Sequence, residues 1–256
     1  MDKVFLSKRK HNIEKYTQIL EKFKDSINLR IFEFNKLKNI KKNTSYIIIR
    51  HDIDHDIKNA VKLAKIEHSL GLRATYCILH SAWYYGELND NKYIHSNLLM
   101  DACYEILAYG HEINFHNNLA VYALKYGIDI EKVLHSEIDF FYKNDIPIIG
   151  SSTHGDKICK ELKFRNWEIF DHACDDRFGG PRKIKFENNE VMLGQLNQKD
   201  FGLEYEAYDF LRNYYLSDSG GNIREHINAR GRDRFPCNDK NNNVNFILTH
   251  PIWWQI

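Results

Sequence analysis

Two aspartates follow a run of apolar residues in the first quarter of the chain. The sequence there reads Tyr46-Ile-Ile-Ile-Arg-His-Asp-Ile-Asp-His-Asp56. Side chains alternate along a strand, so Asp52 and Asp54 are expected on one face. Two carboxylates about 6–7 Å apart at the C-terminal end of a strand suit a metal ligand and a neighbouring general base. The alternative is a strand that ends in a solvated loop.

Three histidines, His116, His154 and His250, stand at or just after later apolar segments. Imidazole and carboxylate donors together suit Zn²⁺, Fe²⁺, Mn²⁺, Co²⁺ or Ni²⁺ better than Ca²⁺ or Mg²⁺. Three protein ligands leave one coordination position for water. A carboxylate beside the metal could take a proton from this water, and a histidine could protonate a leaving amine. These residue types therefore indicate hydrolysis of an amide or an ester.

Alternating strands and helices are predicted to position these residues. The predicted strands cover 46–50, 74–79, 112–116, 146–149 and 246–251. The predicted helices cover 11–25, 57–70, 96–108 and 130–142, and Gly71 is the expected C-cap of the second helix. Polar residues after successive strands are typical of a barrel-like α/β fold with its site at the C-terminal mouth of the strands.

The composition narrows the class of protein. A chain of 256 residues, 43% of them hydrophobic, is long enough for one large α/β domain. The net charge of +1 gives no reason to expect nucleic acid or anionic lipid as a partner. The N-terminus is charged, no apolar run approaches about 18 residues, and the five cysteines are scattered without a CxxC pair. We therefore expect a soluble, cytoplasmic protein without a transmembrane segment; the sequence does not indicate its oligomeric state.

Three short motifs resemble the polysaccharide deacetylase family (NodB homology, carbohydrate esterase family 4). They are Arg50-His-Asp-Ile-Asp54, Gly110-His-Glu-Ile-Asn-Phe-His116 and Leu248-Thr-His-Pro251, and their order and spacing are the specific part. The stretch Tyr215–Gly221 and the tail Ile252–Trp254 are similar to a divergent intracellular branch of that family. The resemblance covers residues 46 to 254.

The resemblance implies a single domain over 1–256, folded as a distorted (β/α) barrel, with residues 1–44 as an N-terminal helical extension packed on it. It also implies metal-dependent removal of an N-acetyl or N-formyl group from an amino sugar in cell-surface polysaccharide biosynthesis. The expected partner is a carbohydrate or sugar-nucleotide substrate. The expected cofactor is one divalent transition metal, first Zn²⁺, with Co²⁺, Ni²⁺, Fe²⁺ or Mn²⁺ as alternatives.

By position in the motifs, the resemblance makes Asp52 the general base and His250 the general acid. It makes Asp54 and His116 metal ligands. His51, His111 and Glu112 are interpreted as supporting residues.

The chain departs from the family pattern at several positions. The usual third metal ligand is replaced by Ala120, and His154 is proposed in its place, with His55, His51 or a water molecule as alternatives. The arginine that often orients the base has no obvious counterpart. Asp171 and Asp218 are both candidates for the aspartate that tunes the acid histidine.

Other features could contact a substrate. Trp83 follows the second predicted strand and could stack on a sugar ring, although core packing explains it equally well. The basic loops over 177–182 and 230–234 could bind a phosphate or uronate, or could be solvated loops. Two alternative functions stay open: a catalytically inert carbohydrate-binding relative, and a hydrolase of non-sugar C–N bonds.

Overall fold

The structure is a computed structural model, and it describes residues 11–24, 29–32, 45–209, 214–227 and 244–256. The basic loop expected over 230–234 lies outside these residues, as does much of the expected N-terminal extension. The chain divides into two compact units. Unit 1 takes its residues from 1–78, 101–113 and 208–256, and unit 2 from 79–100 and 114–207.

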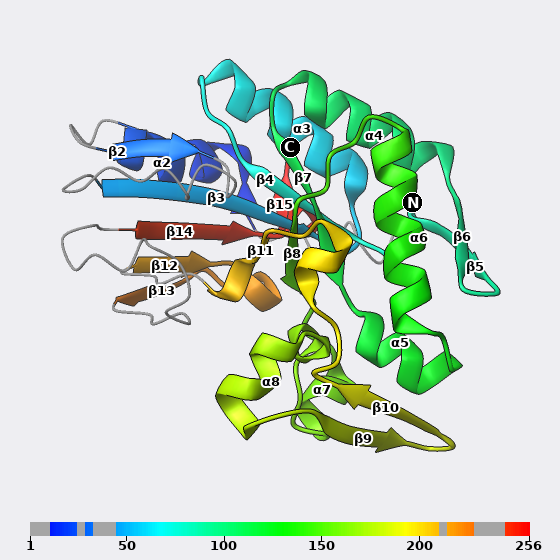
Figure 1. Cartoon of the computed structure of the whole chain (residues 1–256). Coiled ribbons are helices and arrows are strands. Elements are labelled where there is room, and N and C mark those ends of the chain that lie inside the picture. The colour runs from blue at the N-terminus through cyan, green and yellow to red at the C-terminus, as the bar shows by residue number, and fades with distance from the viewer. Residues whose placement is uncertain (1–10, 25–28, 33–44, 210–213, 228–243) are drawn as a thin grey trace. The chain divides into compact units, whose positions relative to one another are not determined.

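Unit 1 is built on a mostly parallel sheet (Figure 1). Its strands lie in the order β4, β3, β14, β12, β13, with β2 beside the first half of β3. The bounds are β2 Leu29–Phe32, β3 Ser45–Ile53, β4 Thr75–Leu79, β12 Tyr214–Ser217, β13 Arg224–Ile227 and β14 Val244–Thr249. The last residue of β4 belongs to unit 2. Strand β12 pairs with β13 in the antiparallel direction, and the other described pairings among these strands are parallel.

The predicted strand over 46–50 is confirmed as the central part of β3. Ile47, Ile48 and Ile49 are all fully buried, so this strand is covered on both faces. Strands inside a parallel sheet read as continuous β-branched runs for this reason. The apolar run lies in the interior of the sheet, with β14 on one side and β2 on the other, whereas β4 pairs with the later residues of β3.

Helix α3 (Ile57–Ser69) confirms the second predicted helix. The carboxylate of Asp56 accepts a hydrogen bond from the backbone N–H of Asn59 and so caps its first turn. Gly71 follows with φ of 72°, which is the left-handed conformation expected after a helix end. Helix α2 (Ile13–Lys24) corresponds to the first predicted helix.

A strand pairing and two side-chain hydrogen bonds hold the C-terminal residues in unit 1. Strand β1 (His11–Asn12) pairs in parallel with β15 (Trp254–Gln255), which follows a single 3₁₀ turn, Pro251–Trp253. The side-chain amide of Asn59 on α3 donates to the carbonyl oxygens of Pro251 and Trp254, both at 2.7 Å. These bonds fix the chain immediately after His250.

Unit 2 contains a smaller parallel sheet in the order β7, β8, β11. Its strands are β7 Glu112–Asn117, whose last four residues belong to this unit, β8 Gly150–Thr153 and β11 Tyr205–Glu206. The ring of Tyr205 packs directly against Gly150, where a Cβ atom would overlap it. The helices wholly inside the unit are α5 Leu119–Tyr126, α6 Ile130–Lys143, α7 Lys157–Glu161 and α8 Asp171–Phe178.

Two hairpins in unit 2 were not predicted: β5 Gly86–Asn89 with β6 Lys92–His95, and β9 Arg182–Phe186 with β10 Asn189–Leu193. Helix α4 (Asn97–Ala108), which begins in this unit and continues in unit 1, was predicted, and so was α6.

The strand predicted over 146–149 is wrong. The segment Ile146-Pro-Ile-Ile149 precedes β8, which begins at Gly150. Pro147 has no N–H to donate to a ladder. Ile146 and Ile148 are nevertheless buried, so the apolar run fills the core without forming a strand.

The expectation of a mixed α/β fold is confirmed. The part of the chain that the structure describes includes no helix long and apolar enough to cross a bilayer.

Candidate functional site

The carboxylate of Asp52 is held at the end of β3 in unit 1. The Nη2 atom of Arg50 donates to Asp52 Oδ2 at 3.0 Å, and both side chains are about 4% exposed. Arg50 also donates to the hydroxyl of Tyr208 at 3.0 Å. Burial lowers the pKa of Arg50, but the charge of Asp52, followed by those of Tyr208, Tyr215 and Cys77, raises it; the net direction is upward, so the guanidinium stays charged.

Arg50 therefore contacts Asp52, the expected general base. This contact was not predicted from the sequence. The signal was present, because Arg50 and Asp52 are two residues apart on one strand and so share a face.

Asp54 lies just past the end of β3, in a tight bend where its N–H donates to the carbonyl of Asp52. It is partly exposed, whereas Asp52 is buried. Its Oδ2 lies 4.0 Å from Nε2 of His250. The strand end and the bend after it thus present one buried and one more accessible carboxylate, both in unit 1.

His250 follows β14 and is bound to Asp218. Its Nδ1 lies 2.6 Å from Asp218 Oδ1, and its backbone N–H donates to Oδ2 at 3.0 Å. The indole N–H of Trp254 donates to the same Oδ2 at 2.7 Å. Asp218 is fully buried, and these donors hold it in one orientation. Of the two aspartates considered for this histidine, Asp218 is the one in contact.

The charges around His250 favour its protonated form. Burial by itself lowers the pKa of His250, but the hydrogen bond and charge of Asp218, followed by the charges of Asp54 and Asp52, raise it to about 9. His250 is therefore protonated at neutral pH, with Nδ1 bound to Asp218 and Nε2 on the side of Asp54.

His116 and His154 lie together in unit 2. Nδ1 of His116 is 2.8 Å from the carbonyl oxygen of Ser152, so this nitrogen carries the proton and donates it. Nε2 of His116 then presents its lone pair, 3.3 Å from Nδ1 of His154. A backbone hydrogen bond of 2.8 Å from His154 to Asn117 holds the loop after β8 in place.

This spacing fits two ligands of one tetrahedral ion. Zn–N bonds of about 2.0–2.1 Å at the tetrahedral angle place two nitrogens about 3.3 Å apart. A metal-binding histidine also commonly donates its other ring N–H to a carbonyl, as His116 does to Ser152. His116 and His154 thus offer two imidazoles in unit 2 that could be ligands of one metal ion.

A further buried histidine, His80, is structural. Its Nε2 accepts the backbone N–H of Asn118 at 3.0 Å, and its Nδ1 lies 2.9 Å from the hydroxyl of Tyr93. Burial, then the charges of His154 and His116, lower its pKa to about 3. His80 is therefore neutral, and both its ring nitrogens are already engaged.

Two other histidines from the motifs lie in the core of unit 1. His51 contacts Glu67 and Thr249, and His111 accepts the N–H of Ala74 while its Nε2 lies 2.9 Å from the carbonyl of Ala64. His51 and His55 were both considered as alternatives for the third metal ligand. His51 is already hydrogen-bonded to Glu67 and Thr249, and the side chain of His55 is exposed.

The remaining predicted residues have varied surroundings. Ala120 is fully buried in the first turn of α5. Asp171 accepts the backbone N–H of His172. Trp83 is 59% exposed, so core packing does not explain it. Arg182, from the first basic loop, bonds Glu168 at 2.6 Å and covers the ring of Phe178.

Comparison with protein-family models gave no match for this chain, and comparisons with curated proteins and with solved structures gave none either.

Proposed function

We propose that the protein is a metal-dependent hydrolase that removes an N-acetyl or N-formyl group from an amino sugar. The observation that carries this proposal is the pair formed by His116 and His154, with nitrogens 3.3 Å apart and the far nitrogen of His116 bound to a carbonyl. This arrangement is typical of metal-ligating histidines.

The proposal includes the fold and the family. The order of motifs, the parallel strands and the position of the polar residues at strand ends support a distorted (β/α) barrel of the polysaccharide deacetylase type. In this proposal Asp54 is the third ligand of the ion and His154 replaces the ligand lost at Ala120.

A bound Zn²⁺ or similar ion supplies a Lewis acid for the amide carbonyl and lowers the pKa of a water molecule. Asp52 accepts the proton of the attacking water, and its ion pair with Arg50 fixes the direction of the carboxyl group. His250 donates a proton to the departing amine through Nε2. Asp218 keeps Nδ1 of His250 protonated, so the transferable proton is the one on Nε2.

The substrate in this proposal is a carbohydrate or a sugar nucleotide. Trp83 presents an exposed indole that could lie against a sugar ring, a contact that suits the apolar face of a pyranose. Acylated amino sugars carry the amide that the acid–base pair requires.

The test is metal content combined with acyl release. After loading with Zn²⁺ or Co²⁺, we expect about one ion per chain and release of acetate or formate from N-acylated sugars or sugar nucleotides. Asp52→Asn should keep the ion and lose turnover, and His116→Ala should lose both. His135→Ala, at an exposed histidine, is the matched control.

Release from linear amides alone would favour the hydrolase of non-sugar C–N bonds. Sugar binding without release of any acyl product would favour the inert relative. Failure to bind metal after loading would refute the proposal.

A further inference from the structure

A carboxylate of unit 1, Glu67 on α3, is fully buried with three polar partners. Its Oε1 accepts from the hydroxyl of Tyr16 and lies 2.8 Å from Nε2 of His51. Its Oε2 accepts from the hydroxyl of Tyr76 at 2.6 Å. Burial raises the pKa of Glu67, but the charge and hydrogen bond of His51, followed by the charge of His111 and the hydrogen bond of Tyr16, together lower it, and the net direction is downward. The group is therefore an ionised carboxylate in the core, which costs free energy unless it is fully paired.

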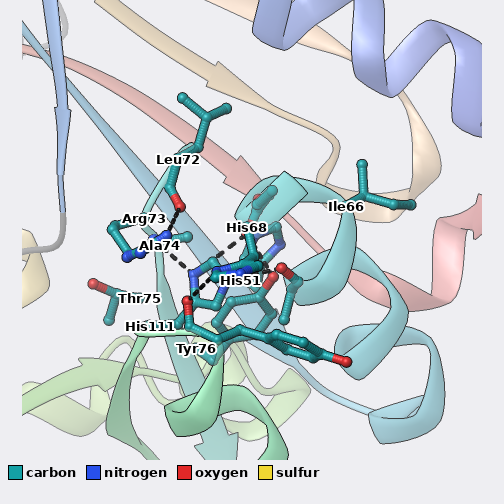
Figure 2. Close-up of polar contacts among 12 residues, drawn as sticks. His51, Ile66, His68, Leu72, Arg73, Ala74, Thr75, Tyr76 and His111 are labelled. Carbon is teal, nitrogen blue, oxygen red and sulfur yellow. Dashed lines mark hydrogen bonds and ion pairs between the residues drawn. The ribbon is translucent and has the colours of Figure 1, made fainter. Parts of the chain in front are cut away.

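The ring of His51 connects this carboxylate to a second strand. Because an ionised carboxylate only accepts, Nε2 of His51 must donate to Glu67. Nδ1 then lies 2.6 Å from Oγ1 of Thr249, directly across from His51 in the pairing of β3 with β14. Tyr76 stacks on His51 with ring centroids 4.3 Å apart, and Figure 2 shows these two rings close to His111.

Glu67, His51 and Thr249 stand in the order of a carboxylate–imidazole–hydroxyl triad. All three are fully buried, so Thr249 cannot reach a substrate as a nucleophile. Nδ1 of the nearby His111 accepts the N–H of Ala74 at 3.0 Å and lies farther, 3.8 Å, from Oε2 of Glu67. The role left to Glu67, His51 and Thr249 is to hold the backbone of the two strands that carry His51 and Thr249.

That backbone carries the proposed acid–base residues. His51 directly precedes Asp52, and Thr249 directly precedes His250. Strand side chains alternate, so a bond between His51 and Thr249 joins the two strands on the face opposite their neighbours. The proposed base and the proposed acid are thus one residue away from the same buried hydrogen bond.

We propose that Glu67 is a positioning residue of the site: through His51 and Thr249 it fixes the ends of β3 and β14, and with them Asp52 and His250. This inference rests on the proposed function. The carboxylate of Glu67 holds Nε2 of His51 as a donor, and this fixes the ring with Nδ1 against the Thr249 hydroxyl. A neutral partner at position 67 removes the charge that orients the ring and so weakens the cross-strand bond.

The experiment compares variants of the metal-loaded full chain in the acyl-release assay. Glu67→Gln keeps the shape and removes the charge, and it should lower kcat about 10–100-fold, as loss of an outer partner typically does, with KM within about twofold. Thr249→Val should have a similar effect. Both changes interrupt the same chain of hydrogen bonds from Glu67 through His51 to Thr249. The loss of kcat in the double variant should therefore be smaller than the product of the losses in the two single variants.

Glu137→Gln is the matched control. Glu137 is an equally buried carboxylate, in unit 2, that accepts from the hydroxyl of Tyr85 and lies 2.8 Å from Nε2 of His95. Its substitution should lower the denaturation midpoint as much as Glu67→Gln does and leave kcat and KM unchanged.

The inference is overturned if Glu67→Gln behaves as Glu137→Gln does, or if the Glu67 and Thr249 effects multiply fully. These outcomes require an active wild-type protein, so they leave the proposed function intact. A wild-type protein that binds no metal and releases no acyl product refutes the proposed function, and this inference falls with it.

Discussion

Replacing Asp218 with asparagine should shift the titration of His250 strongly. The structure raises the pKa of His250 to about 9, mainly through Asp218 against the effect of burial. With the charge removed, burial acts with less opposition, and the pKa should fall toward or below the ordinary value of 6.5. The interval from 6.5 to about 9 corresponds to about 3.5 kcal/mol, at roughly 1.4 kcal/mol per tenfold change.

The sign of the pH effect on stability follows from the direction of the shift. A histidine with a raised pKa in the folded state contributes stability that is fully present below pH 6.5. That contribution is lost as the pH rises through about 9. The gap in unfolding free energy between the wild-type protein and Asp218→Asn should therefore narrow by up to about 3.5 kcal/mol from the acidic to the alkaline side.

The assay uses metal-free protein with ¹³C-labelled histidine. NMR titration gives the pKa of His250, and urea unfolding across the same pH range gives the stability gap. Asp171→Asn is the control, because Asp171 contacts His172 and lies in unit 2. Titration of His250 at the same pH in wild type and Asp218→Asn would refute the reasoning.

Three further changes test other parts of the structure. Arg50→Met leaves Asp52 buried without its cation and should cost about 3–5 kcal/mol in urea unfolding; Arg50→Lys keeps the charge, and an equal loss there would count against the ion pair. Gly150→Ala places a methyl group against the ring of Tyr205 and should cost about 1–3 kcal/mol. Tyr205→Leu in the same chain should restore part of that stability, and no recovery would contradict the packing argument. Zn²⁺ at about 100 times its dissociation constant should raise the unfolding free energy by about 2.7 kcal/mol. Excess EDTA should reverse this gain and His154→Ala should abolish it, whereas an equal gain in His154→Ala would exclude His154 as a ligand.

Strongly periodic segments were predictable from the sequence. The strand at 46–50 and the helix from Ile57 were identified because β-branched runs and helical spacing directly reflect burial. Strand β8 was displaced by a few residues, since Ile146–Ile149 is apolar enough for a strand but contains Pro147. The polar Gly150-Ser-Ser-Thr153 forms the ladder with no apolar signal at all.

The candidate site was predictable in residue types and less so in contacts. Asp52, Asp54 and His250 belong to two short motifs, and unit 1 brings their side chains near one another. The choice between Asp171 and Asp218 could not be made from the sequence, because it depends on which loop reaches His250. The role of Glu67 was equally hidden, since a charged residue at helical spacing reads as part of a solvated face.

The position of β14 bears on how the protein folds during synthesis. This strand comes after β3 and β12 in the chain and is therefore synthesised after them, yet it lies between them in the sheet of unit 1. Until it emerges, β3 and β12 each have an unpaired edge of apolar sequence, a known template for association between chains. A nascent chain that stalls before residue 244 should therefore need a chaperone more than the completed protein does. His250, the residue proposed to donate the proton, directly follows β14, so it is synthesised together with the strand that pairs with both edges.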